Sequence, residues 1–256
     1  MSVEVHAHGS SRVLRIHRPE ARNAIDEITA NSLVDCALEC ASDPSVRALI
    51  LAATPPTFIA GGDLRAFANH LGVEGGHTVS DLGHRLIAAL HGTRLPLLAA
   101  IEGPAYGGGC ELAAACDFRF MSPHASLHWV QGLMGVTTGW GATHRLNALI
   151  HATLATQWLL APAPVTAQEA FAAGFLSLPP DPGGALTQAL VMAERIATVS
   201  RSVTAAQLAL LRAAREPTGP QRQLERELFA ACWAEPPHEE AVARFIARSG
   251  DRESST

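Results

Sequence analysis

The chain has 256 residues, of which 48% are hydrophobic, and its formal net charge is −5. This composition supplies enough apolar side chains for one large buried core, and it offers no basic surface of the kind that binds nucleic acid. All 19 residues counted as lysine or arginine are arginines, so chemistry that needs a Schiff-base lysine or a phosphate-binding-loop lysine is excluded.

The five cysteines include no Cys-x-x-Cys pair and are odd in number, which indicates free thiols rather than disulfides or a metal site. The N-terminal residues lack the cationic and apolar regions of a signal peptide. No apolar run approaches the roughly 18 residues that a membrane-spanning helix needs. We therefore expect a cytoplasmic protein that has no bound metal and does not enter membranes.

In the first half of the chain, apolar runs typical of strands alternate with helical patterns. The elements predicted in chain order are a strand over 13–17, a helix over 26–42, a strand over 46–52, a helix over 81–90, a strand over 95–102, a helix over 111–116 and a strand over 118–121. The nearly continuous apolar character of the second and third strands is typical of strands that are buried on both faces. This alternation predicts an α/β fold.

The second half of the chain is predicted to be helical. Helices are expected over 143–150, 154–160 and 166–173, followed by two longer helices that end near Arg248. Thr166, with Glu169 three residues later, forms a capping-box pattern at the start of the third of these helices. The Pro/Gly-rich residues 179–184 are a clear break. We therefore divide the chain into a core domain, residues 1–178, and a C-terminal helical lobe, residues 179–256, which we expect to serve oligomerisation.

Two glycine-rich turns, residues 58–64 and 103–112, are the most informative features of the sequence. Each follows a predicted buried strand and opens into a helix-like segment, whose first N–H groups have no partner within the helix. Two such turns that face each other could bind one oxygen atom between two peptide N–H groups, as an oxyanion hole does. Because Glu111 lies beside the second turn, the pattern points to chemistry on a carbonyl whose oxygen gains negative charge. The alternative is that both turns need glycine only for positive φ.

At these residues the chain resembles the crotonase (enoyl-CoA hydratase/isomerase) superfamily, over about residues 10–250. The matching segments are residues 17–24, both glycine turns, 116–119, 133–146 and 239–245. The resemblance implies a core of ββα units wound into a spiral, or superhelix, with a C-terminal helical lobe. It also implies a coenzyme A thioester as substrate, no separate cofactor, and assembly as a homotrimer or a dimer of trimers.

The resemblance assigns catalytic roles to four residues. The main-chain N–H groups of Gly62 and Gly108 correspond to the oxyanion donors. Glu111 matches the first of the two glutamates that enoyl-CoA hydratases use on water, although a glutamate there would also complement the helix dipole. Gln131 stands where the second glutamate is expected. An amide cannot act as a general acid or base near neutral pH, but it can orient a water molecule or a substrate carboxylate.

This departure favours one branch of the superfamily. Loss of CO2 from a malonyl-type thioester generates the carbanion itself and needs little general base. Residues 117–146, with Trp140 between two glycines, look closest to the ethylmalonyl-CoA decarboxylase branch. We therefore prefer a lyase that decarboxylates a short malonyl-type acyl-CoA. The alternatives are an enoyl-CoA hydratase or isomerase that uses Glu111, and a non-catalytic subunit that binds CoA thioesters.

The family also assigns the residues that contact the CoA portion of the substrate. Trp140 is a candidate wall of the acyl pocket, although large aromatic residues more often belong to the core. Asp63 has an equally good alternative role as a helix cap. The spacing of the glycines does not fit the Gly-x-Gly-x-x-Gly pattern of a dinucleotide-binding oxidoreductase. The predicted CoA contacts are Arg22, Asn23, Ala24, Ala60, Gly61, Asp63 and Leu64.

Overall fold

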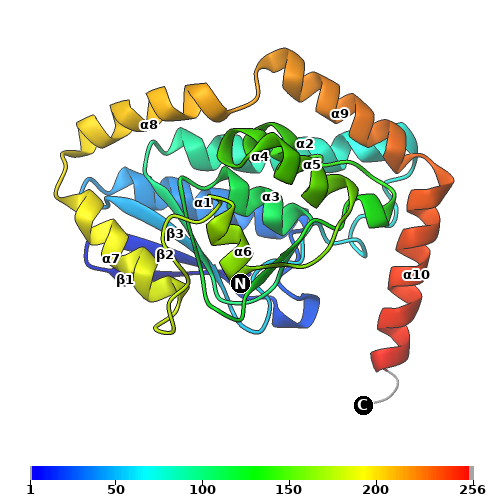
Figure 1. Cartoon of the computed structure of the whole chain (residues 1–256), viewed down its shortest axis with the longest axis horizontal. Helices are drawn as coiled ribbons and strands as arrows, with labels where there is room; N and C mark the ends of the chain where they lie inside the picture. The colour runs from blue at the N-terminus through cyan, green and yellow to red at the C-terminus, as the bar shows by residue number, and fades with distance from the viewer. Residues whose placement is uncertain (1, 254–256) are drawn as a thin grey trace.

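The computed structural model describes residues 2–253 and is built on a five-stranded sheet (Figure 1). The strand order is β1-β2-β3-β4-β6, in which β1 pairs antiparallel with β2 and the other pairs are parallel. The strands are β1 (Val3–His8), β2 (Ser11–Ile16), β3 (Ala48–Ala53), β4 (Leu97–Ile101) and β6 (Phe118–Met121). A second, smaller sheet contains β5 (Ala105–Tyr106), β7 (Ser126–His128) and β8 (Val165–Thr166).

Helices cover both faces of the large sheet, which explains why the central strands are apolar throughout. In β3, Leu49 and Leu51 belong to the main core, whereas Ala48 and Ile50 face a second cluster built around α7. The first helices are α1 (Glu27–Ser42), α2 (Gly72–Gly92), α3 (Gly108–Ala115), α4 (Ala142–Leu149), α5 (Ala152–Leu160) and α6 (Ala167–Ala172). The predicted α/β class is confirmed, as is the capping box at the start of α6.

The prediction of two long helices at the C-terminal end was wrong, because residues 179–253, which the structure describes, form four. They are α7 (Ala185–Ala197), α8 (Arg201–Arg215), α9 (Gly219–Trp233) and α10 (Pro236–Glu253). Helix-starting residues divide the region: Ser200 caps α8 through the N–H of Val203, and Thr218 begins α9 with a capping box. Figure 1 shows α8 and α9 lying across the body of the protein and α10 descending from its end.

The boundary between residues 178 and 179 stays a prediction. The first helix beyond it, α7, packs on β3, β4 and β6 and so completes the sheet's second face. Helices α8 to α10 lie farther out, and α9 packs mainly on α2. Among the described residues, no helix combines the length and apolar character that crossing a membrane requires.

A buried ion cluster fixes α8 to the end of the sheet. Asp117, which precedes β6, accepts a hydrogen bond from Nη2 of Arg212 at 2.5 Å and pairs with Arg215. The same carboxylate accepts the main-chain N–H of Leu97 at 2.8 Å. Removing the charge of Asp117 leaves two arginines uncompensated in a site where water is scarce.

We expect Asp117→Asn to lower the free energy of unfolding by about 3 kcal/mol, in the range found when one partner of a buried pair is removed. Urea denaturation of the variant beside Asp43→Asn measures this effect, because the Asp43–Arg12 pair is more exposed. Equal stability of the two variants would show that the cluster does not anchor α8.

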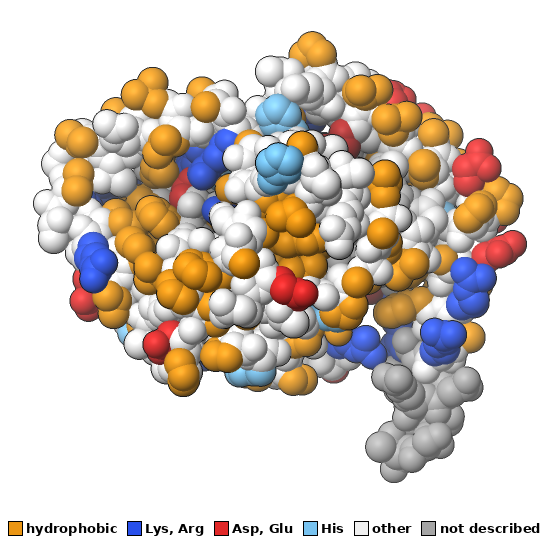
Figure 2. Space-filling view, viewed as in Figure 1, with side chains coloured by type: hydrophobic (Ala, Val, Ile, Leu, Met, Phe, Trp, Pro, Cys, Tyr) orange, Lys and Arg blue, Asp and Glu red, His pale blue; other side chains and the backbone are white. Residues whose placement is uncertain are grey.

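Hydrophobic side chains remain exposed along the outer helices. Leu210 and Leu211 on α8, and Leu224 and Leu228 on α9, are each at least half exposed. Figure 2 shows hydrophobic side chains scattered along the edge of the molecule that these helices form. By contrast, Phe229, which belongs to the same apolar pattern in the sequence, is buried within this chain.

Candidate active site

The two glycine turns lie side by side. The N–H of Tyr106 donates to the carbonyl of Ile59 at 2.9 Å, so the segments that carry the turns are hydrogen-bonded to each other. Gly61 has φ of +94°, and a Cβ there would lie 3.0 Å from the main-chain nitrogen of Gly108. Glycine is therefore required both by the backbone conformation and by the close approach of the second turn.

Two main-chain donors are left unpaired where the turns meet. Gly62 and Gly108 are partly exposed, and neither donates its N–H to a main-chain oxygen outside its own element, among the residues that the structure describes. Gly108 is the first residue of α3, so its N–H belongs to the unsatisfied end of that helix. Two fixed donors so placed can bind one negatively charged oxygen.

Glu111 lies one turn into α3, on the side of the helix that Gly108 occupies. Its Oε1 accepts hydrogen bonds from Nε2 of Gln131 at 3.0 Å and from the N–H of Gly139 at 3.3 Å. Its Oε2 accepts the N–H of Trp140 at 2.8 Å and of Ala142 at 3.3 Å. The side chain is buried, and four donors surround its two oxygens.

Burial and hydrogen bonding act in opposite directions on Glu111. Burial raises the pKa of its carboxyl group above the ordinary value, because a charged group loses hydration. The donors from Gln131 and from the main chain of residues 139–142 oppose this rise, because they stabilise the carboxylate. Glu111 is therefore a buried carboxyl group held by directed donors, which can act as a base if it is deprotonated.

Gln131 is close to Glu111, as the family resemblance implies. Only 8% of its surface is exposed, and its Oε1 has no hydrogen-bond partner among the described residues. A buried acceptor without a donor costs free energy, so this oxygen is poised to accept a hydrogen bond from a water molecule or from a ligand. The amide can orient such a group but cannot exchange a proton with it.

Trp140 fills the space beside both turns. A Cβ at Gly108 would lie 2.6 Å from Cζ3 of its indole, and one at Gly62 would lie 3.8 Å from Cζ2. Gly83 of α2 packs on the other part of the ring, and Nε1 donates to the carbonyl of Val79 at 3.1 Å. The indole is therefore buried, fixed in orientation, and in contact with the elements that carry the oxyanion donors.

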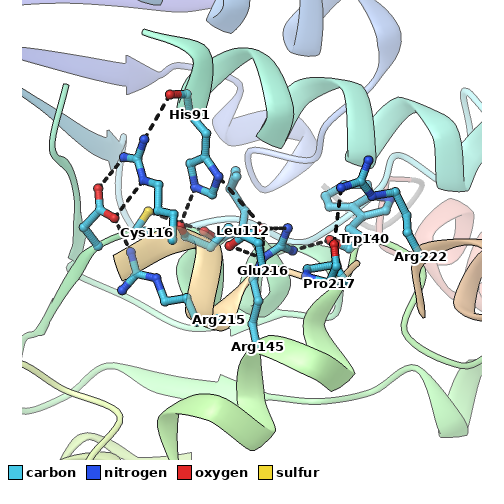
Figure 3. A network of polar contacts seen from close by, with 12 residues as sticks. His91, Leu112, Cys116, Trp140, Arg145, Arg215, Glu216, Pro217 and Arg222 are labelled. Carbon is cyan, nitrogen blue, oxygen red and sulfur yellow. Dashed lines mark hydrogen bonds and ion pairs between the residues drawn. The ribbon is translucent and has the colours of Figure 1, made fainter. Parts of the chain in front are cut away.

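Arg145 fixes the main chain at Trp140 through a hydrogen bond to its carbonyl oxygen. Figure 3 shows its guanidinium between the carboxylate of Glu216 and the carbonyl of Trp140. The distances are 2.9 Å from Nε to Glu216 and 2.5 Å from Nη1 to Trp140. This ion pair links α8 and α4 to the loop that binds Glu111, and its role was not foreseen from the sequence.

The predicted CoA-contacting segments, residues 22–24 and 60–64, are adjacent. The N–H of Ala60 donates to the carbonyl of Arg22 at 3.2 Å, and a short bridge pairs Ile25 with Gly62. Arg22 is exposed, Ala60, Gly62 and Leu64 are partly exposed, and Ala24 and Gly61 are buried. These residues form one strip that leads to the oxyanion donors.

Two side chains in this strip have structural partners. Asn23 is buried and donates to the carbonyls of Thr54 and Thr57, each at 2.7 Å. Asp63 pairs with Arg18 at 3.0 Å and accepts the N–H of Arg65 at 3.1 Å, which fits the alternative role as a cap. Their predicted contribution to CoA binding therefore depends on the main chain more than on these side chains.

Sequence reasoning missed a second carboxyl group near Glu111. Glu225 of α9 accepts a hydrogen bond from the hydroxyl of Thr138, in the loop that binds Glu111. The pKa of Glu225 is raised to about 7 by burial first and then by the charge of Glu111. It lies 114 positions beyond Glu111, and no motif links the two, so only the fold brings them together.

Comparisons with known proteins identify the family. A family model described as enoyl-CoA hydratase/isomerase matches residues 8–251. The chain is 32% identical to a crotonyl-CoA hydratase of Syntrophomonas wolfei, over 91% of this chain and 90% of that protein. It is also 32% identical to 2,3-dehydroadipyl-CoA hydratase of Escherichia coli, over 91% of each chain.

Solved structures show the same fold. An enoyl-CoA hydratase/isomerase from Pseudoalteromonas atlantica T6c superimposes with a TM-score of 0.84 at 26% identity, covering 97% of this chain and 98% of that one. The α/β architecture with its C-terminal helices is therefore the crotonase fold. The chain belongs to the enoyl-CoA hydratase/isomerase family.

Proposed function

We propose that this protein binds a short-chain acyl-CoA thioester and stabilises its enolate between the N–H groups of Gly62 and Gly108. The observation that carries the proposal is the meeting of the two glycine turns, with both donors unpaired and Glu111 one helical turn away. A thioester oxygen held there gains negative charge as the α-carbon becomes a carbanion, and fixed donors stabilise that charge.

Hydration of an enoyl-CoA is the reaction that the relatives support best. Hydratase names are common among them, including a crotonyl-CoA hydratase and a short-chain-enoyl-CoA hydratase. Glu111 would remove a proton from the water as its oxygen bonds to the β-carbon, and would then return that proton to the α-carbon of the enolate, while Oε1 of Gln131 would accept the water's other hydrogen bond. No cofactor beyond the CoA thioester is needed for this chemistry.

Decarboxylation of a malonyl-type thioester is the second candidate, and the surroundings of Glu111 favour it. Four donors already surround the two oxygens of Glu111, so a water molecule must compete with at least one of them. Loss of CO2 requires no such base. It requires the oxyanion donors to stabilise the enolate that forms as CO2 leaves, and a proton from water to complete the product at the α-carbon.

The same proposal extends to the substrate's CoA portion and to assembly. The strip formed by residues 22–24 and 60–64 would contact the pantetheine and adenine groups, mainly through its main chain. The exposed leucines of α8 and α9 would be covered in a homotrimer or a dimer of trimers. We place this assembly in the cytoplasm.

Two assays separate the candidate reactions. Crotonyl-CoA hydration is followed by the loss of thioester absorbance, and CO2 release is followed with methylmalonyl-CoA and ethylmalonyl-CoA. Gln131→Glu is expected to raise hydration at least about tenfold, because it supplies a second group able to transfer protons. The same substitution should leave the rate of CO2 release unchanged or lower it.

Gln157→Glu, an exposed glutamine-to-glutamate change on α5, is the matched control and should alter neither rate. If Gln131→Glu gains no hydration, Gln131 does not occupy the position of the second catalytic glutamate. If the wild-type protein turns over neither class of thioester while binding CoA tightly, the non-catalytic alternative replaces both reactions.

A further inference from the structure

The loop that binds Glu111 is held from two sides. From α3, Glu111 accepts the main-chain N–H groups of residues 139, 140 and 142. From α9, Glu225 accepts the hydroxyl of Thr138 and a main-chain hydrogen bond from Thr143. The segment 138–143 therefore lies between two carboxyl groups that come from distant parts of the sequence.

Hydroxyl groups connect Glu225 to the surface. The hydroxyls of Thr138 and Thr143 lie 2.6 Å apart, and Thr143 is exposed whereas Thr138 is buried. Since Thr138 has one proton and donates it to Glu225, it must accept the proton of Thr143 in the second contact. This chain can reverse when Glu225 is protonated, because a carboxylic acid donates instead.

The charges that face Glu225 do not neutralise it. Glu111 on α3 adds a second negative charge. Arg145 on α4 opposes it, but the guanidinium of Arg145 is already paired with Glu216 from the end of α8. Two neighbouring carboxyl groups, of which Glu225 faces one partly compensated arginine, favour the uptake of a proton by one of them.

None of the charged groups on α2 or α9 forms an ion pair with Glu225 in the part of the chain that the structure describes. On α2, Asp81 is paired with Arg226 of α9 at 2.7 Å. His84 of α2 has its pKa lowered to about 4, first by burial and then by Arg145, so it is neutral at neutral pH. Burial raises the pKa of both carboxyl groups, but Glu111 has four directed donors whereas Glu225 has those of Thr138 and Thr143, so we assign the shared proton to Glu225.

We propose that Glu225 is a positioning residue for Glu111, because it fixes from α9 the same segment whose main chain holds Glu111 from α3, and because its proton sets the charge beside Glu111. The stability test below requires no substrate. Only the turnover test rests on the proposed function. The two tests can therefore fail separately.

The stability test compares Glu225→Gln with wild type at pH 5 and pH 8. With a folded-state pKa near 7, above the ordinary 4.5, folded Glu225 binds its proton more tightly than the unfolded chain does. The resulting stability is present at acid pH and is lost as the pH rises through 7. Glutamine stays neutral, so the Tm of the variant relative to wild type should rise by at least about 4 °C between pH 5 and pH 8.

Glu235→Gln, an exposed carboxylate just after α9, is the control, and its Tm relative to wild type should not depend on pH. Thr138→Val is the second variant. It removes the hydroxyl that stabilises the charged form of Glu225. The variant should therefore lose stability with a midpoint at higher pH than wild type does. This shift tests the contact between Thr138 and Glu225 even if Glu225→Gln does not fold.

The turnover test uses whichever thioester the protein converts. The ratio of Glu225→Gln turnover to wild-type turnover should change at least threefold between pH 6 and pH 8 and follow one ionisation, because glutamine mimics only protonated Glu225. A purely structural role would give one ratio at every pH. If neither the Tm difference nor the turnover ratio between Glu225→Gln and wild type changes with pH, the proposal is overturned. A pH-dependent Tm difference without any turnover would keep the carboxyl pair and reject the proposed function.

Discussion

Glu111→Gln is expected to lower thioester turnover by about 10²- to 10⁴-fold, the usual contribution of a positioned general base. The change also replaces one acceptor oxygen by an NH2 group, while the four donors around the side chain remain. Donors would then face donors in a buried site. We therefore expect a loss of about 1–3 kcal/mol in the free energy of unfolding as well.

Turnover and urea denaturation measured on the same preparation separate these two effects, with turnover assayed where the variant is fully folded. Glu169→Gln is the control, because Glu169 forms the exposed capping box of α6, far from the turns in sequence. A folded Glu111→Gln protein with turnover within threefold of wild type would rule out Glu111 as the base. For decarboxylation, where CO2 leaves without a base, the loss should be smaller than for hydration.

Trp140→Ala is expected to cost about 3–5 kcal/mol, because it empties a buried site in contact with three glycines. Gly83→Ala should also destabilise the protein, by about 1–3 kcal/mol, since the new Cβ would lie 2.0 Å from Cγ of Trp140. In the Trp140→Ala background this clash is absent. The double-mutant cycle should therefore give a coupling energy of about 2 kcal/mol.

Gly92→Ala on the same helix is the control, because nothing lies within 4 Å of the position that its Cβ would take. It should change stability by no more than about 1 kcal/mol. In function, Trp140→Ala should shift the preferred acyl chain toward longer substrates, since the indole occupies space next to Gly62 and Gly108. Additive destabilisation together with an unchanged chain-length preference would mean that Trp140 is only a core residue.

The parts of the fold with a strong periodic signal were predictable from sequence. The helix at 26–42 is α1, and the apolar runs at 46–52 and 95–102 are β3 and β4. The start of α2 was missed by nine residues, because Gly72, Gly75 and Gly76 suggest a loop. Gly76 is part of α2 all the same, and a glycine is needed there because α9 packs closely on it. A Cβ at this position would lie 2.6 Å from Cα of Ala230.

The meeting of the two turns was predictable from sequence, because each residue there acts through the local chain, whereas the roles of these residues stay predictions. Gly62, Gly108 and Glu111 belong to two turns whose spacing indicates their geometry. Glu111 lies one helical turn beyond Gly108. The family resemblance implies that Gln131 lies close to Glu111, and the two side chains are 3.0 Å apart. Glu225 was not predictable, because it reaches the site only through the packing of α9 on α2.

We propose that the N–H groups of Gly62 and Gly108 bind one thioester oxygen beside Glu111. A crystal structure of the protein with a bound short-chain acyl-CoA would show whether they do. We predict that the thioester oxygen lies about 2.7–3.1 Å from both glycine nitrogens, with the α-carbon facing Glu111. A thioester oxygen bound away from either nitrogen, or an acyl group excluded from the turns by Trp140, would contradict the account.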